Sequence, residues 1–393
     1  MEEEKNEINE KREIGIRKKV IVSISVIVVL SIFVVILLYV FNSEFREIID
    51  MNVLKKNVST ENVPTIDLDI NKTNQLCVYS KYIAILNEKK VYLYNNYGET
   101  VAEIPVDINN AIFASSNKYL AIAEDGGKNF YLFLETTYLW SGTIDGEIKQ
   151  IHVNQNGYIA IVTTDATYKS IITLYDQEGK EIFKKYLSST RVIDVGMSKD
   201  NKYLAIAELD TSGTFLQSTV EVISVEDVAK NSEKSVIYSY SADRGKLITK
   251  IKYQDRNRLA CMYDDHVQVI DENLQSEDVL IENSNVTYAS VNLNNNFIYV
   301  TEEVKGLFKS SSVIHICNNQ GITTSTYNLE EVAKEVYACD NVIAINVGME
   351  VHFINDSGWL VKRVSSKQEI TNISFSGNLA VIVYKDRVEI INL

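Results

Sequence analysis

The chain has 393 residues, of which 46% are hydrophobic and 23% charged, and its formal net charge is −14. This composition excludes a disordered chain and a protein with many membrane spans. The acidic balance also argues against nucleic acid as a partner, because phosphate binding requires clustered Lys and Arg. With only 2 Pro and 4 Cys the chain is no disulfide scaffold, and its 23 Tyr and 12 Phe favour strands.

The first element along the chain is a membrane anchor. Residues 20–41 carry no charged side chain, and these 22 residues suffice for the roughly 20 that a helix needs to cross the hydrocarbon core. The segment is longer than the core of a cleaved signal peptide, and it lacks a small-residue cleavage pattern at its end. We therefore expect an uncleaved transmembrane helix.

The charges that flank this segment predict its orientation. Six basic residues precede it, whereas the stretch that follows has three: Lys5, Lys11, Arg12, Arg17, Lys18 and Lys19 against Arg46, Lys55 and Lys56. Lys and Arg accumulate on the cytoplasmic side of a span. We therefore expect a cytoplasmic tail over residues 1–19, a stalk over 42–64 and an extracytoplasmic domain over 65–393, in a protein of the cell membrane.

The region after the stalk repeats one pattern eight times. Its anchor reads apolar–apolar–Ala–apolar, and the average spacing of about 42 residues is typical of propeller blades. The clearest copies begin at Tyr82, Tyr119, Tyr158 and Tyr203, and weaker copies begin at Arg258, Phe297, Val342 and Asn378. A second apolar pattern follows each anchor and usually ends in Asn or Asp.

Four of these units place a Gly three residues after the Asn or Asp, at Gly98, Gly179, Gly321 and Gly358. This arrangement between two apolar segments is typical of hairpins, because Gly adopts a positive φ. We therefore predict that each unit forms four antiparallel strands. The units together should form a ring, which makes the fold a single all-β β-propeller. Eight blades are favoured, and seven blades with one irregular insertion are the alternative.

The last unit ends at Leu393 after its third strand, so its fourth strand must come from elsewhere. Residues 65–70 precede the first unit and alternate polar and apolar side chains. We predict that they form the outer strand of the last blade, because an open ring would leave unpaired strand edges.

Two segments resemble the repeats of known propellers. Residues 198–205 (SKDNKYLA) resemble the turn of WD40-like and quinoprotein-like repeats without its Pro, and residues 174–181 (LYDQEGKE) resemble their hairpin. The chain, over about residues 17–393, is similar to domain-of-unknown-function family 5711, a family of bacterial membrane proteins with one span. The resemblance implies a fold and a topology, and it supplies no catalytic residue.

The His and Cys residues give no clear metal or cofactor site. His315 and His352 occupy a strand position where other units have Glu, Thr or Tyr, and a zinc site needs three or four converging ligands. We expect no metal and no cofactor, since the two Trp do not form the pattern that docks a quinone. Cys317 and Cys339 either form a disulfide between neighbouring blades or are buried free thiols like the other two Cys.

The connection between the second and third strands varies in length and suggests a partner surface. It is moderate at residues 164–170 and long at 209–219 and 301–312. These loops emerge on one face of a propeller, so Tyr168, Phe215 and Phe308 would share that face as partner anchors. The alternative is that these loops have lengthened without acquiring a function, because the scaffold tolerates insertions there. A further insertion at 226–234 predicts a short polar helix on the opposite face.

No catalytic constellation appears in the sequence, so we predict a binding protein rather than an enzyme. The expected role is a scaffold of the bacterial cell envelope that binds another envelope protein. One alternative is a sensor that binds a sugar or cell-wall fragment in the central channel. The other is a propeller lyase or quinone-dependent dehydrogenase.

Overall fold

The computed structural model describes residues 24–41, 45, 49, 63–69, 75–228, 235–281, 285–304 and 310–393. The chain divides into two compact units, residues 1–58 and 59–393. In the first unit, the helix Ile24–Phe41 has 18 residues and is long and apolar enough to cross a membrane. The predicted tail at 1–19 and, apart from isolated positions, the predicted stalk at 42–64 lie outside the described residues.

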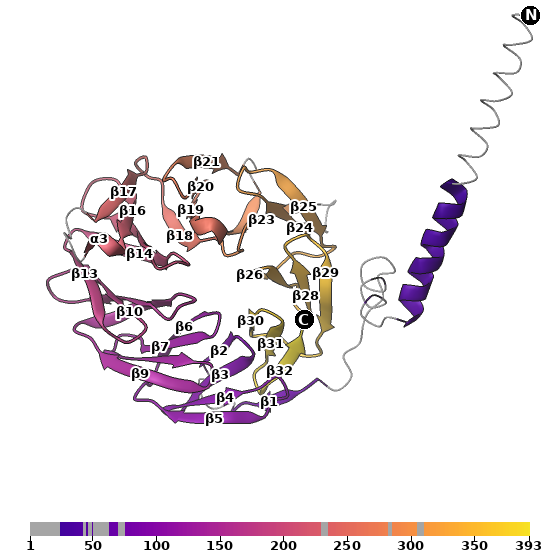
Figure 1. Cartoon of the computed structure of the whole chain (residues 1–393), viewed down its shortest axis with the longest axis horizontal. Helices are drawn as coiled ribbons and strands as arrows, with labels where there is room; N and C mark the ends of the chain where they lie inside the picture. The colour runs from indigo at the N-terminus through magenta and orange to yellow at the C-terminus, as the bar shows by residue number, and fades with distance from the viewer. Residues whose placement is uncertain are drawn as a thin grey trace, which may run out of the picture. The chain divides into compact units, whose positions relative to one another are not determined.

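The second unit is a β-propeller whose blades follow one another around a central channel (Figure 1). Within the described part of the chain there are eight four-stranded antiparallel sheets, so the alternative of seven blades is excluded. We call the strands of each blade A to D, from the centre outwards. The A–B and C–D turns lie on one face of the ring, called here the A–B face, and the B–C turns lie on the other, called the B–C face.

The strands are these. Blades 1 to 4 consist of β2 (Gln75–Tyr79), β3 (Tyr82–Asn87), β4 (Lys90–Tyr94) and β5 (Thr100–Pro105); β6 (Ala111–Ser116), β7 (Tyr119–Glu124), β8 (Asn129–Leu134) and β9 (Thr137–Thr143); β10 (Glu147–Val153), β11 (Ile159–Thr164), β12 (Ser170–Tyr175) and β13 (Glu181–Leu187); β14 (Thr190–Met197), β15 (Tyr203–Asp210), β16 (Gln217–Ser224) and β17 (Val236–Ser241). Blades 5 to 8 consist of β18 (Ile248–Tyr253), β19 (Leu259–Tyr263), β20 (His266–Ile270) and β21 (Ser276–Leu280); β22 (Val286–Ser290), β23 (Phe297–Val304), β24 (Ser310–Cys317) and β25 (Thr323–Asn328); β26 (Glu335–Cys339), β27 (Val342–Asn346), β28 (Glu350–Asn355) and β29 (Leu360–Ser365); β30 (Asn372–Ser376), β31 (Leu379–Val383), β32 (Arg387–Asn392) and β1 (Thr65–Asp67).

The ring closes as the sequence predicts. Strand β1 pairs antiparallel with β32, and Ile66 lies opposite Val388. The pairing continues beyond the strand, because the N–H of Ile390 donates to the carbonyl of Pro64 at 2.9 Å and the N–H of Leu68 donates to Asp386 at 2.8 Å. The closing strand has three residues rather than the six predicted, and Ile70 lies outside the described residues.

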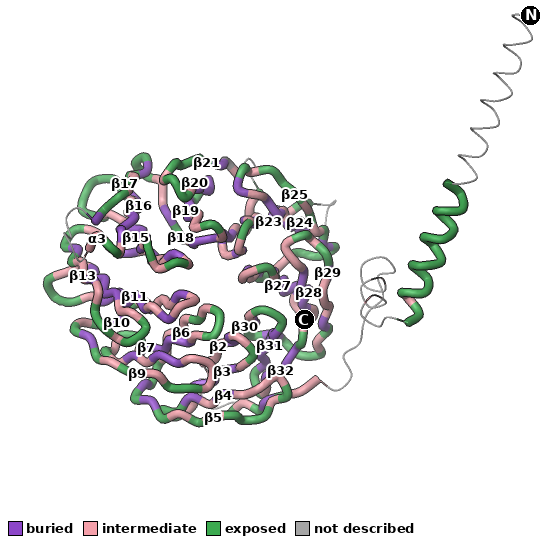
Figure 2. The backbone as a smooth tube through the Cα atoms, in the orientation of Figure 1, coloured by how far each residue is buried: buried purple, intermediate pink, exposed green. Residues whose placement is uncertain are grey.

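The core lies between consecutive blades rather than inside one sheet. Alternate side chains of each B strand face the preceding and the following blade, so both faces are buried and the middle of the strand is mostly apolar (Figure 2). The repeated Ala is the small residue of this pattern. Ala205 is fully buried and shares a hydrophobic cluster with Ile251, Tyr253 and Leu259 of the next blade.

The C–D hairpins have the predicted chemistry. The four glycines have φ between +78° and +83°. In the turn of blade 3 the N–H of Gly179 donates to the carbonyl of Asp176 at 3.1 Å, and Asp176 Oδ1 accepts the N–H groups of Glu178 and Lys180. A Cβ at position 179 would also come within 3.0 Å of the Trp140 ring. Blade 5 builds the same turn with Leu274 at a φ of +61°.

Two predicted insertions differ in extent from the structure. Residues 209–219 are not all loop, because β15 and β16 each run to eight residues and leave a loop of 211–216. Likewise β23 and β24 reach Val304 and Ser310. The predicted helix at 226–234 begins one residue earlier as α3 (Val225–Val228), and residues 229–234 lie outside the described part. The four Cys are free thiols, so Cys317 and Cys339 form no disulfide.

Candidate functional site

The B–C face carries a pair of contacting loops on blades 3 and 4. Loop 165–169 is ordered by Asp165, whose Oδ1 accepts the N–H groups of Thr167 and Tyr168 at 2.7 and 2.6 Å. Lys169 then joins it to its neighbour: its Nζ donates to Thr211 Oγ1 at 3.3 Å and to the carbonyl of Ser189 at 2.8 Å. The two loops therefore form one surface.

Two of the three predicted partner residues lie on this surface. Phe215 is 58% exposed on loop 211–216, and Tyr168 is half-buried with its ring 4.8 Å from that of Tyr186. Phe308 lies outside the described residues. Tyr186 and Leu216 were not predicted from the sequence as partner residues, but they are 52% and 40% exposed beside the other two. We call Tyr168, Tyr186, Phe215 and Leu216 the B–C patch.

A polar tie links the blades that carry the patch. Lys185 of β13 forms ion pairs with Glu208, at 3.1 Å, and with Glu221, both of blade 4. Glu208 also accepts the hydroxyl of Thr190 at 2.7 Å. Burial alone would lower the pKa of Lys185, but the two glutamates outweigh it and raise that pKa. The charged lysine thus holds the two blades in a fixed relation.

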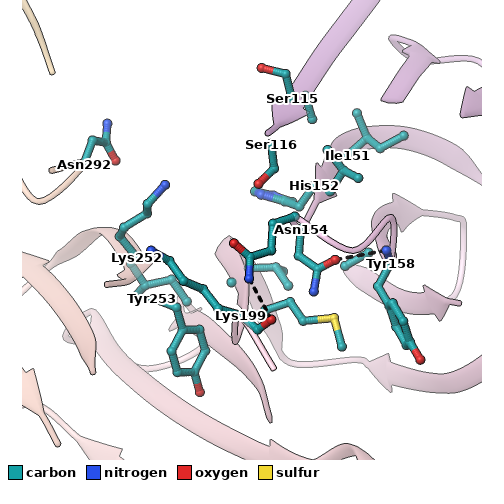
Figure 3. Close-up of a pocket in the computed structure, with 18 of the residues that line it drawn as sticks. Ser115, Ser116, Ile151, His152, Asn154, Tyr158, Lys199, Lys252, Tyr253 and Asn292 are labelled. Carbon is teal, nitrogen blue, oxygen red and sulfur yellow. Dashed lines mark hydrogen bonds between the residues drawn. The ribbon is translucent and has the colours of Figure 1, made fainter. Parts of the chain in front are cut away.

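A second candidate surface is the mouth of the central channel on the A–B face, where a cavity of about 360 Å³ lies among the A strands of blades 2 to 5. Figure 3 shows Lys252 and Asn292 on one side of this cavity, and Ser116 and His152 opposite them. Lys199 and Lys250 also line the wall, and the lining contains no Asp or Glu.

Side-chain hydrogen bonds join neighbouring A strands around the channel. Gln150 Nε2 of β10 donates to the carbonyl of Ile193 in β14 at 3.0 Å. Asp194 Oδ2 of β14 accepts the N–H of Ile251 in β18 at 2.9 Å. The A strands of different blades belong to separate sheets and are not joined by backbone ladders. These side-chain bonds join them instead, and they fix the spacing of the strands that form the channel wall.

The rim of the mouth is joined in the same way from blade 3 to blade 7. Asn156 Nδ2 donates to the carbonyl of Lys199 at 2.8 Å, and Asn257 Nδ2 donates to Asp200 at 2.9 Å. The chain of contacts continues at residues 294–295 and 340, where Asn295 Nδ2 donates to Asp255 at 2.7 Å and the N–H of Asn294 to the carbonyl of Asp340 at 2.8 Å. The rim is therefore rigid over these blades.

The histidine of the channel wall is uncharged at neutral pH. Burial lowers the pKa of His152 to about 4; the charge of Asp194 opposes this shift, and that of Lys250 adds to it. Its Nε2 lies 3.2 Å from Gln150 Oε1. His152 is therefore a hydrogen-bonding group in this wall and not a cation.

The two histidines singled out in the sequence bond to other blade side chains, His315 within blade 6 and His352 of blade 7 to the neighbouring blade 6. His315 stacks on Tyr299 with ring centres 4.5 Å apart and lies 2.9 Å from Thr301 Oγ1. His352 lies 2.9 Å from the hydroxyl of Tyr327. Among the described residues no group of three or more His, Cys, Asp or Glu side chains is placed to hold a metal ion.

Comparison with known proteins places the chain in a family. The model of DUF5711, a family of unknown function, matches residues 54–393 and so includes the whole propeller. The chain belongs to the DUF5711 family. No curated protein matches the DUF5711 chain significantly.

Solved structures show the same fold at low sequence identity. BamB from Moraxella catarrhalis is 12% identical with a TM-score of 0.52, over 85% of this chain and 99% of that one. Chaetomium thermophilum Sqt1, solved bound to the N-terminus of ribosomal protein L10, is 11% identical with a TM-score of 0.54, over 86% and 100%. The C-terminal WD40 domain of Sif2 is 12% identical with a TM-score of 0.55, over 84% and 99%. The DUF5711 chain thus shares the β-propeller fold of these structures.

Proposed function

We propose that this DUF5711 protein is a membrane-anchored scaffold of the bacterial cell envelope, whose propeller lies outside the cytoplasm and binds another envelope protein through the B–C patch. The observation that carries the proposal is the grouping of aromatic and aliphatic side chains, three of them exposed and one half-buried, on two contacting loops and the adjacent strand β13. Phe215 and Leu216 lie on one loop, and Tyr168 on the next loop packs against Tyr186.

The physics of interfaces supports this surface. Aromatic side chains bury a large area at a small cost in conformational entropy, and they dominate the energy of protein interfaces. The loops sit on strands that the Lys185 tie holds together, so little order has to be gained on binding. A propeller of this fold, Sqt1, holds a segment of another protein in its solved structure.

The inferred role is binding rather than catalysis. A binding surface needs a rigid platform with exposed anchors, which blades 3 and 4 supply. A lyase or dehydrogenase would need converging carboxylates, a metal or a cofactor site, and the channel cavity is lined by lysines and amides instead.

The test is in-cell cross-linking, followed by extraction in detergent and mass spectrometry of the proteins that copurify. Phe215→Ala should reduce recovery of one dominant envelope protein about tenfold, as expected for an interface anchor worth more than ~1 kcal/mol. The matched control is Tyr97→Ala, because Tyr97 is 69% exposed in a C–D turn on the opposite face. Equal recovery with both variants would refute the proposed surface.

A further inference from the structure

The charged residues that line the channel cavity are all basic, although the chain as a whole is acidic. The chain carries a net charge of −14, yet the cavity lining includes Lys199, Lys250 and Lys252 and no acidic residue. An acidic protein repels anions over most of its surface, so lysines gathered at one concave site are a feature that favours anion binding there.

Two of the three lysines are paired with carboxylates, one buried behind the wall and one on the rim. Lys250 Nζ lies 3.1 Å from Asp194, whose side chain is only 4% exposed and also accepts the N–H of Ile251. Lys199 forms an ion pair with Asp255 on the rim. Asp194 and Asp255 are themselves fixed by backbone and amide donors, so these two lysines are positioned groups.

The third lysine is the available charge. Lys252 is half-buried in β18, where its backbone pairs with Ala260 of β19. Its ammonium group forms no hydrogen bond or ion pair with any residue that the structure describes, although its charge acts on the thiol of Cys339. It extends into the cavity in Figure 3. Among the three lysines of the described lining, Lys252 is therefore the one whose charge no carboxylate pairs.

Polar groups that could complete an anion site lie beside Lys252 and opposite it. The side chains of Asn292 and Ser116 line the same cavity (Figure 3). An ammonium group with amide and hydroxyl donors is the set that binds a carboxylate or phosphate, since hydrogen bonds to a charged acceptor are the strong ones. The hydrogen-bonded rim of blades 3 to 7 keeps Lys252 and Asn292 in place before a ligand arrives, which lowers the cost of binding.

The size of the cavity fits a small molecule. Its volume of about 360 Å³ lies at the lower end of the range for ligand pockets, roughly 300–1,000 Å³. We propose that the channel mouth binds a small anionic ligand through a carboxylate or phosphate group held by Lys252. This site is separate from the B–C patch, and the proposal does not depend on the proposed function.

The test measures anion binding by the full-length protein in a non-ionic detergent at low salt. Citrate, inorganic phosphate and an N-acetylated tetraglutamate peptide are titrated separately by calorimetry. At least one should bind, and Lys252→Met should weaken that binding about tenfold or more, as expected for loss of a charge-assisted hydrogen bond. Binding by the peptide alone identifies an acidic protein segment as the source of the anion, and binding by citrate or phosphate identifies a free small anion.

Controls separate this site from general charge effects and from misfolding. Lys128→Met removes the same charge at an exposed position in a B–C turn and should leave binding unchanged. Lys252→Arg keeps the charge and should retain most of the affinity; it also shows that the position tolerates substitution. The proposal is overturned if none of the three probes binds, or if Lys252→Met and Lys128→Met have equal effects.

Discussion

At the scale of single residues, the repeated alanine determines how close the blades can come. Ala205 in β15 is fully buried, and its methyl group faces Ile251 and Tyr253 of the next blade. A larger side chain would have to displace the A strand of blade 5, and close-packed cores do not yield that volume. The apolar–apolar–Ala–apolar anchor is therefore a packing signal.

Replacing Ala205 with Trp should destabilise the propeller by about 3 kcal/mol or more through overpacking. Thermal unfolding followed by circular dichroism measures this effect. Ala166→Trp is the control, since Ala166 is exposed on loop 165–169. Equal unfolding temperatures for the two variants would contradict the assignment of Ala205 to the interface between blades.

Residue patterns predicted the repeat more fully than the candidate sites. Phe215 could be found because an aromatic residue in a long B–C connection is conspicuous. Tyr186 could not, because its position in a D strand resembles any outward-facing strand residue. Lys250 and Lys252 are two positions apart in an A strand, so the sequence indicates that they share one face of that strand. That this face lines the channel is seen only in the closed ring.

At the scale of elements, the ring depends on a three-residue strand from the other end of the domain. Ile66 of β1 is 6% exposed and shares a cluster with Ile83 of blade 1 and with Val381, Val388 and Ile390 of blade 8. Its side chain therefore bridges the first and last blades. The sequence predicted this closure from the missing fourth strand of the last unit, which is a topological argument and needs no motif.

Ile66→Ala should lower the free energy of unfolding by about 2–5 kcal/mol, the range for truncating a buried aliphatic side chain. Thr65→Ala, at an exposed position of the same strand, should change it by no more than about 0.5 kcal/mol. Urea unfolding of both variants is the measurement. A loss for Ile66→Ala as small as that for Thr65→Ala would show that β1 does not close the ring.

Strand ends were harder to predict than strand identities. Leu209, Asp210 and the polar residues 217–219 were predicted as loop, but in the structure they extend the hairpin of β15 and β16. Pairing with the neighbouring strand overrides the weak strand preference of these side chains. As a result, the loop that carries Phe215 is short and is raised on a longer hairpin.

At the scale of the whole molecule, the chain combines one apolar helix that could cross a membrane with a closed propeller. The first 19 residues have as many acidic as basic side chains, so the net charge of −14 belongs to the rest of the chain. The excess of Lys and Arg before the helix favours an N-terminus in the cytoplasm. We infer that the propeller faces the opposite side of the membrane.

Fusions at the C-terminus test this orientation. Alkaline phosphatase folds only outside the cytoplasm, so a fusion after Leu393 should be active, and the matching β-galactosidase fusion should be inactive. The reversed pattern of activities would place the propeller in the cytoplasm. It would also exclude an extracytoplasmic partner.

If the B–C patch holds an envelope protein, site-specific photo-cross-linking in cells should capture the contact. A benzophenone side chain placed at Phe215 should form one discrete adduct with a single envelope protein. The same group at Tyr97, on the opposite face, should form none. No adduct from position 215, or the same adduct from both positions, would contradict the account.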